Sequence, residues 1–271
     1  MLAGSFFGVG NEKLTIAMIA AFFVAIILCM EFGRWLGRRS YSRAGDEAFG
    51  ASGTIDGAMF ALLGLLIAFT FSGAALRFEE RRALIRDEAN AVGTAYLRVD
   101  LVNADAQPVL RQNFRDYLDA RLDAYSDVTD PAGLERKIAK AGALQLQLWG
   151  NAVAAAAATP GPQATTVLLP AINEMFDMAT TRIVAVQTHP PMVVFGMLAF
   201  LALACSTTAG FGMASGNRRR EWLHVLAFAS SIALTLYVII DLEYPRIGLV
   251  TITGADQILR DVRATMGPAL R

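Results

Sequence analysis

The chain has 271 residues, of which 55% are hydrophobic and only 18% are charged. Soluble domains carry about 25% charged residues, so this deficit points to a membrane protein. Its 24 basic and 24 acidic residues cancel to a formal net charge of zero, which argues against nucleic acid as a partner.

The first apolar run, Leu14 to Met30, is followed by arginines and by the interfacial aromatic Trp35. A cleaved signal peptide is the alternative interpretation, because the run is short. The segment lacks a basic leader and a small-residue cleavage site, however, so we expect a membrane helix over 14–36.

The central stretch, residues 55–100, organises the rest of the chain. Its first half, Gly57 to Leu76, is twenty residues without a charge, which as a helix covers about 30 Å, the thickness of the bilayer hydrocarbon. Its second half is rich in charge, and no proline separates the two. The pattern predicts a span over 55–77 that continues beyond the membrane as the same helix.

Residues 101–189 have the composition of a soluble helical module. Apolar residues recur at three- and four-residue spacings in three stretches, 107–127, 132–158 and 163–188, which Pro131 and the Pro160–Pro162 segment separate. We expect three helices that pack on one another and on the extended second helix.

Two further apolar runs predict spans over 191–214 and 222–242, and a short amphipathic tail follows. The predicted fold is an all-α integral membrane protein with four transmembrane helices. Its expected parts are 1–77 with the first two spans, 78–189 as the soluble module, 190–243 with the last two spans, and 244–271 as a C-terminal tail.

The orientation of this layout stays open. Four spans place the module and both termini on one side, and the loops 38–54 and 215–221 on the other. The second loop holds Arg218, Arg219 and Arg220, so the positive-inside rule leans towards cytoplasmic loops. The arginines near the spans on the module side nearly balance them.

No catalytic constellation emerges from the sequence. Neither His189 nor His224 belongs to a metal-spacing or nucleophile–base pattern. Cys29 and Cys205 lie in apolar segments without CxxC spacing, so we interpret them as small apolar side chains. We therefore expect neither an enzyme nor a bound cofactor or metal.

The charged cluster after the second span has two interpretations. Residues 79–88 offer several opposite-charge pairs at i,i+3 and i,i+4, which would simply stabilise a solvated helix. If copies of the chain surround an axis, charges here would instead set the potential at a pore mouth. The candidates for that role are Arg77, Arg81, Arg82 and Glu80.

Two stretches carry a resemblance to a known family. FSGAALRFEERRALIRDEANAVGTAYLR at 71–98 and DLEYPRIGLV at 241–250 resemble the bestrophin-like membrane proteins of bacteria and plants. More distantly, residues 61–84 are similar to the second transmembrane helix of bacterial bestrophin channels. The four-span layout with a helical module in its middle is also similar to the bestrophin arrangement.

The resemblance implies a homo-oligomeric ion channel, a pentamer in the bacterial inner membrane, that passes anions. It also implies an apolar pore constriction on the second span at Leu62, Leu65 and Phe69, which would gate by dewetting, and a cytoplasmic module. The residues themselves do not choose between anions and cations. No acidic N-terminal cluster is available to bind calcium, so calcium activation is not supported.

The alternative function is a non-conducting membrane protein. In that case the helical module at 101–189 would sense or scaffold a partner, and the apolar residues of the second span would face lipid or other helices.

Overall fold

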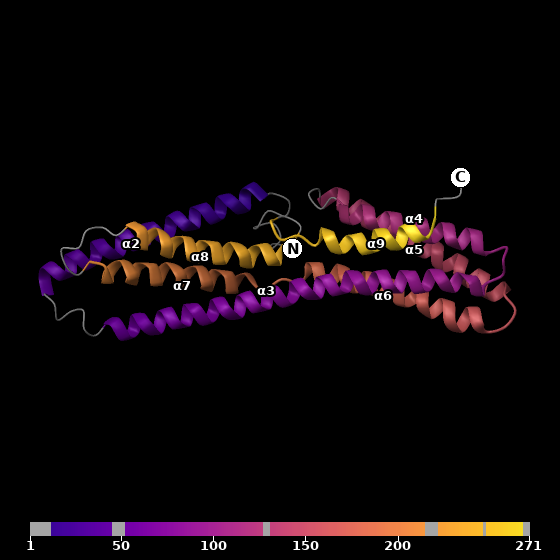
Figure 1. Cartoon of the computed structure of the whole chain (residues 1–271), viewed down its shortest axis with the longest axis horizontal. Helices are drawn as coiled ribbons and strands as arrows, with labels where there is room; N and C mark the ends of the chain where they lie inside the picture. The colour runs from indigo at the N-terminus through magenta and orange to yellow at the C-terminus, as the bar shows by residue number, and fades with distance from the viewer. Residues whose placement is uncertain (1–11, 45–51, 127–130, 215–221, 246–247, 268–271) are drawn as a thin grey trace. The chain divides into compact units, whose positions relative to one another are not determined.

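The computed structural model describes residues 12–44, 52–126, 131–214, 222–245 and 248–267, and within these ranges it contains helices and no strand (Figure 1). The prediction of an all-helical fold is confirmed. In chain order the α-helices are α2 (Glu12–Ala44), α3 (Ser52–Leu97), α4 (Gln107–Ser126), α5 (Pro131–Ala158), α6 (Leu169–Gln187), α7 (Met192–Gly212), α8 (Trp222–Glu243) and α9 (Thr253–Thr265).

Four of these helices, α2, α3, α7 and α8, are long and apolar enough to cross a membrane, as the sequence predicted. α3 runs for 46 residues and continues past Leu76, where the uncharged run ends. A helix does this where propensity is good and no proline interrupts it. The predicted arginine loop at 215–221 and the N-terminal segment 1–11 lie outside the described residues.

The chain divides into two compact units. The described residues up to Leu76, together with His189–Tyr244, form what we call the membrane unit. Arg77–Thr188 and the described residues from Pro245 onwards form what we call the module. α3 contributes its first half to the membrane unit and its second half to the module. α9 comes from the segment 244–271 that we expect as a C-terminal tail, and it lies in the same compact unit as Arg77–Thr188.

In the membrane unit, α2 packs closely along α7 and also contacts α8. A Cβ atom added to Gly33 would lie 1.9 Å from the Thr207 carbonyl oxygen, and one added to Gly210 would lie 1.9 Å from the Met30 carbonyl oxygen. Only glycine therefore allows the two backbones to come so near. Lipid offers no hydrophobic drive for helix association, so this close packing supplies much of the attraction.

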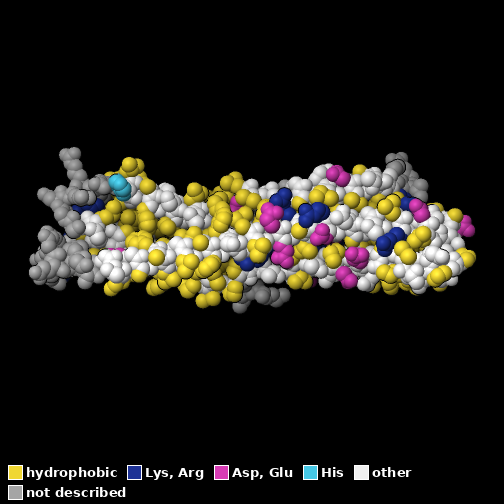
Figure 2. Space-filling view, turned by 60° about the horizontal axis from the view of Figure 1, so that its bottom comes forward, with side chains coloured by type: hydrophobic (Ala, Val, Ile, Leu, Met, Phe, Trp, Pro, Cys, Tyr) yellow, Lys and Arg dark blue, Asp and Glu magenta, His cyan; other side chains and the backbone are white. Residues whose placement is uncertain are grey.

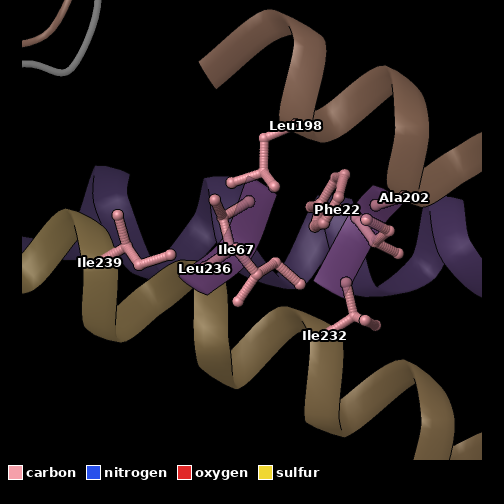
Figure 3. Close-up of a pocket in the computed structure, with 8 residues that line it drawn as sticks. Phe22, Ile67, Leu198, Ala202, Ile232, Leu236 and Ile239 are labelled. Carbon is pink, nitrogen blue, oxygen red and sulfur yellow. The ribbon is translucent and has the colours of Figure 1, made fainter. Parts of the chain in front are cut away.

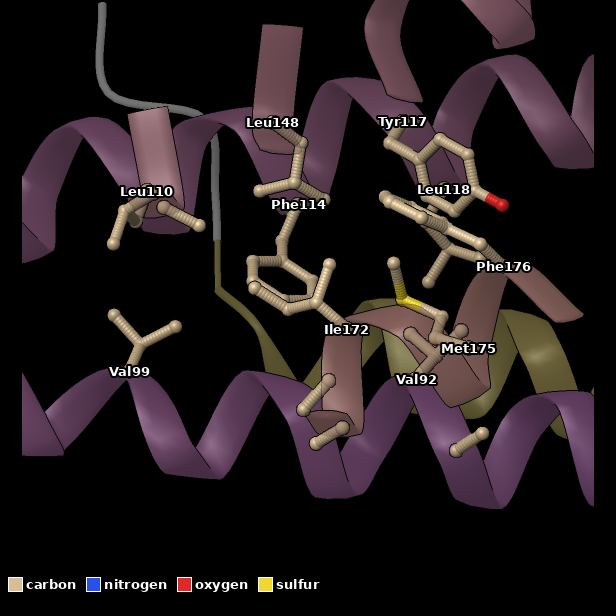
Figure 4. Close-up of a cluster of buried hydrophobic side chains, with 14 of the residues drawn as sticks. Val92, Val99, Leu110, Phe114, Tyr117, Leu118, Leu148, Ile172, Met175 and Phe176 are labelled. Atoms are coloured by element: carbon tan, nitrogen blue, oxygen red, sulfur yellow. The ribbon is translucent and has the colours of Figure 1, made fainter. Parts of the chain in front are cut away.

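In the module, α4, α5 and α6 enclose the second half of α3 around one apolar core. Figure 4 shows this core, in which Val92 and Val99 of α3 lie near Phe114 of α4 and Ile172 of α6. α9 adds Leu259, whose side chain is fully buried in the same core. The module thus buries apolar side chains against one another, as a water-soluble helical domain does.

Candidate functional site

The first half of α3 leaves a broad apolar face exposed. Phe69 is 68% exposed, Leu62 56% and Leu65 51%, and their spacing of three and four residues places them on one side of the helix. Leu63 and Ala74, on the opposite side, are buried in the core of the membrane unit. The three predicted constriction residues therefore share a face that the other helices of the membrane unit leave uncovered.

A small cavity lies where the four membrane helices meet, and Figure 3 shows its lining. Phe22 of α2, Ile67 of α3, Leu198 of α7 and Leu236 of α8 each contribute an apolar side chain to it. All eight side chains of the lining are apolar. The cavity therefore offers no polar group that could replace the hydration shell of an ion.

Charged side chains appear on α3 where the module begins. Glu80 and Arg82 are exposed and Arg77 is partly exposed. Arg82 donates a hydrogen bond of 2.9 Å to Glu79 Oε1, which is the i,i+3 pair that the spacing predicts. Figure 2 shows the same contrast on one face, with hydrophobic side chains over much of the membrane unit and Asp, Glu, Lys and Arg gathered over the module.

Arg81 differs from the other three candidate charges because it is buried, with 3% of its surface exposed. Its guanidinium donates hydrogen bonds to the Ala185 carbonyl oxygen (3.2 Å) and to the Thr188 carbonyl oxygen (2.9 Å). Both carbonyls belong to the C-terminal end of α6, where helices leave carbonyl groups without an internal partner. Arg81 thus caps the C-terminal end of α6.

A cluster of four buried charges joins four helices of the module. Glu88 of α3 accepts from Arg121 of α4, whose Nη2 lies 2.6 Å from Glu88 Oε1, and from Arg182 of α6, whose Nη1 lies 2.6 Å from Glu88 Oε2. The other end of the Arg182 guanidinium donates to Asp256 Oδ1 of α9 at 2.6 Å. All four side chains are at most 7% exposed.

Local charge spacing places Glu88 in the charged run 79–88 and does not single out the other three residues of the cluster. A signal was present, because each charge continues the apolar stripe of its helix. Met175, Ala179 and Arg182 are buried and recur at spacings of four and then three residues. Glu88 lies between the buried Ile85 and Val92, at spacings of three and four. A charge in register with buried residues indicates a buried pair rather than a solvated side chain.

Residues 241–246 belong to the second stretch that resembles the bestrophin-like family, and the first three of them end α8. Asp241 and Glu243, near the end of α8, are both buried. His189 Nδ1 lies 3.6 Å from Glu243 Oε2, and its ring stacks on Tyr244 with centroids 4.5 Å apart. Arg246 lies outside the described residues.

Four helices long and apolar enough to cross a membrane, which meet at an apolar cavity, and an all-helical module after the second of them define an integral membrane protein. The model of the Bestrophin-like domain family matches residues 21–255. The chain therefore belongs to the bestrophin-like family, and bestrophins are known as ion channels.

Solved structures support the fold. A point variant of a bacterial bestrophin homologue from Klebsiella pneumoniae aligns with a TM-score of 0.72 at 13% identity, covering 93% of this chain and 96% of that chain. A second structure of a Klebsiella pneumoniae homologue gives 0.65 at 14%, covering 89% and 98%. A structure described only as a membrane protein gives 0.69 at 13%, covering 94% and 100%. A comparison with curated proteins found no significant match.

Proposed function

We propose that this protein is a homo-oligomeric ion channel of the bacterial inner membrane, a pentamer in which α3 of each copy lines the axis. Leu62, Leu65 and Phe69 form its apolar constriction. Glu80, Arg82 and Arg77 lie at its mouth, and Arg81 holds the helix that carries them. A ring of Phe and Leu side chains excludes water when narrow, and it conducts when small rotations of the helices widen it.

The observation that carries this proposal is the uncovered apolar face of α3. Membership of the family gives the class of protein, and the cavity between the four helices is small and lined by apolar side chains. We therefore place the conduction path between several copies, where the face at Leu62, Leu65 and Phe69 is available to line it.

Anions are the ions that the resemblance implies, and the mouth charges bear on this choice. Arg77 is the first charge after the uncharged run, which favours anions. Exposed Glu79 and Glu80 oppose it, while Arg81 is occupied with the end of α6. The reversal potential of reconstituted protein under a sodium chloride gradient decides between anions and cations.

The first test is the mass of the detergent-solubilised protein by light scattering. We expect a mass of five copies. A monomer or dimer overturns it, because one pore-lining helix from each of one or two chains does not close a ring around a path.

The second test is ion flux in liposomes. Phe69→Ala and Leu65→Ala remove bulk from the constriction, and we expect each to raise chloride or sodium flux above wild type by about tenfold, as for a change of about 1.4 kcal/mol in the gating equilibrium. Val193→Ala is the matched control, because Val193 is an exposed apolar residue of α7 rather than of α3. Unchanged flux in both α3 variants contradicts the assigned constriction.

A second candidate function is a non-conducting sensor or scaffold, and one observation favours it. α5 exposes Leu146, Trp149 and Val153 on the module, at spacings of three and four residues. Exposed apolar stripes of this kind mark protein–protein contacts. A pure, correctly folded protein that carries no ions and captures a different protein through α5 would support this function over the channel.

A further inference from the structure

We propose that the buried cluster Glu88–Arg182–Asp256 is a tether through which the C-terminal helix α9 holds α3 and so keeps the constriction narrow. This inference rests on the channel function proposed above. The residues of this tether position α3 from outside the constriction and the mouth.

The tether is continuous from α3 to α9. One guanidinium, that of Arg182, donates from Nη1 to Glu88 Oε2 and from Nη2 to Asp256 Oδ1, both at 2.6 Å. A planar guanidinium that binds two carboxylates through separate nitrogen atoms fixes both the distance between the two carboxylates and their directions. α9 therefore does not slide or turn against α3 without breaking a buried ion pair.

Further contacts hold the other end of α9. The Met266 carbonyl oxygen accepts from Arg115 Nη1 at 2.9 Å and from the Tyr96 hydroxyl of α3 at 3.3 Å. Arg263 donates to Asp119 of α4 at 2.7 Å, in an exposed pair. α9 is thus fixed to α3 at two levels, at Glu88 through Arg182 and at Tyr96 directly.

The buried ion pairs explain why breaking a contact at the Asp256 end of α9 should have the larger effect. Asp256 supplies one of the two carboxylates that Arg182 binds, and both of these ion pairs are buried. When α9 leaves, Arg182 loses the Asp256 carboxylate, and breaking a buried ion pair is costly. The seated position of α9 and the packed position of α3 therefore stabilise each other.

The tether reaches the constriction through one helix. Glu88 and Phe69 both belong to α3, which has no proline or break between them. Loosening α3 at Glu88 frees it to tilt or rotate, and such motions widen an apolar constriction. Breaking the tether is therefore expected to raise ion flux. We expect the coupling free energy between the α9 contact and the constriction to lie in the usual range for two linked sites.

The test is ion flux through full-length protein reconstituted in liposomes, measured with chloride and with sodium. Asp256→Asn removes the charge of α9 with little change in shape, and we expect flux about tenfold above wild type. Asp256→Glu keeps the charge and should stay closer to wild type. Asp261→Asn is the matched control, because Asp261 lies on the exposed side of α9 and accepts a hydrogen bond from Gln257 of the same helix.

A double variant separates a tether from general destabilisation. If α9 acts through the constriction, adding Asp256→Asn to Phe69→Ala raises flux little beyond that of Phe69→Ala alone. If Asp256→Asn only causes a nonspecific leak, the effects of the two substitutions on flux are additive. If the Asp256→Asn variant does not assemble, Asp119→Asn is used instead. It weakens the exposed pair between Arg263 and Asp119, and we expect a smaller rise in flux. Hydrogen exchange at the α9 amides should rise in either variant.

The outcomes distinguish the two proposals. If Phe69→Ala conducts but the Asp256 and Asp119 variants match the Asp261→Asn control or fall below wild type, the tether is overturned and the channel stands. Additive flux in the double variant also overturns the tether. If wild type and all variants are silent, the channel itself is overturned, and the gating role of α9 falls with it.

Discussion

The two halves of α3 follow opposite rules. In the membrane unit the helix exposes Leu62, Leu65 and Phe69 and buries Leu63 and Ala74 on its other side. In the module it buries the charged side chains of Arg81 and Glu88 among partners from other helices. One continuous helix thus carries exposed apolar residues in one unit and buried charges in the other.

The difference reflects what each half packs against. Apolar side chains exposed to lipid cost nothing, so an uncovered face in a membrane unit is tolerated until another helix covers it. A buried charge in the module is tolerated only with a complete set of partners. In the proposed channel the first half therefore makes the contacts between copies, whereas the second half is fixed within its own chain.

The largest effect is expected at the buried charges. Glu88→Ala leaves Arg121 and Arg182 without their shared carboxylate, and we expect a loss of about 3–5 kcal/mol in the free energy of unfolding. Thermal unfolding in detergent measures it. Glu79→Ala, which removes only the exposed pair with Arg82, should cost less than about 1 kcal/mol. Equal losses for the two variants would contradict the difference between buried and exposed charges.

The next effect is expected between α2 and α7. Gly210→Ala places a Cβ atom against the Met30 backbone, where nothing flexible can move aside, and we expect a loss of about 1–3 kcal/mol. Gly196→Ala is the control on the same helix, because a Cβ atom there meets nothing within 4 Å. Thermal stability in detergent separates the two, and a loss of the same size in both would argue against a close contact.

A third variant tests whether the uncovered half of α3 contacts a second copy. A Cβ atom at Gly64 meets nothing within 4 Å in the single chain. Gly64→Leu should therefore leave the fold of each chain intact while it weakens assembly, because small residues allow membrane helices to approach. Light scattering across a dilution series should show smaller particles than wild type. Unchanged mass would mean that Gly64 faces lipid.

The smallest effect is expected on ion preference. Neutralising Glu80 removes a negative charge near the proposed mouth, so Glu80→Gln should shift relative permeability towards chloride by about two- to fivefold, and Arg82→Gln should shift it towards sodium. Reversal potentials under a salt gradient measure both. Identical reversal potentials in wild type and both variants would remove these charges from the conduction path.

Much of the candidate site follows from local spacing. Leu62, Leu65 and Phe69 share a face in any α-helix, so the sequence predicts which residues can act together. It does not predict that the other helices leave this face uncovered. Arg81 shows the limit most clearly, because its neighbours in sequence are exposed charges, while its hydrogen bonds go to carbonyls more than a hundred residues away.

The sequence by itself determined the four spans, the continuation of α3 beyond the membrane and the helices of the module. These depend on the length of uncharged runs, on apolar periodicity and on prolines, which act over a few turns. Only the tertiary structure decided that Glu88, Arg182 and Asp256 meet, that α9 belongs to the module, and that Gly33 and Gly210 bring two backbones together. Those contacts join segments far apart in the chain, and their energies depend on which side chains are removed from solvent together.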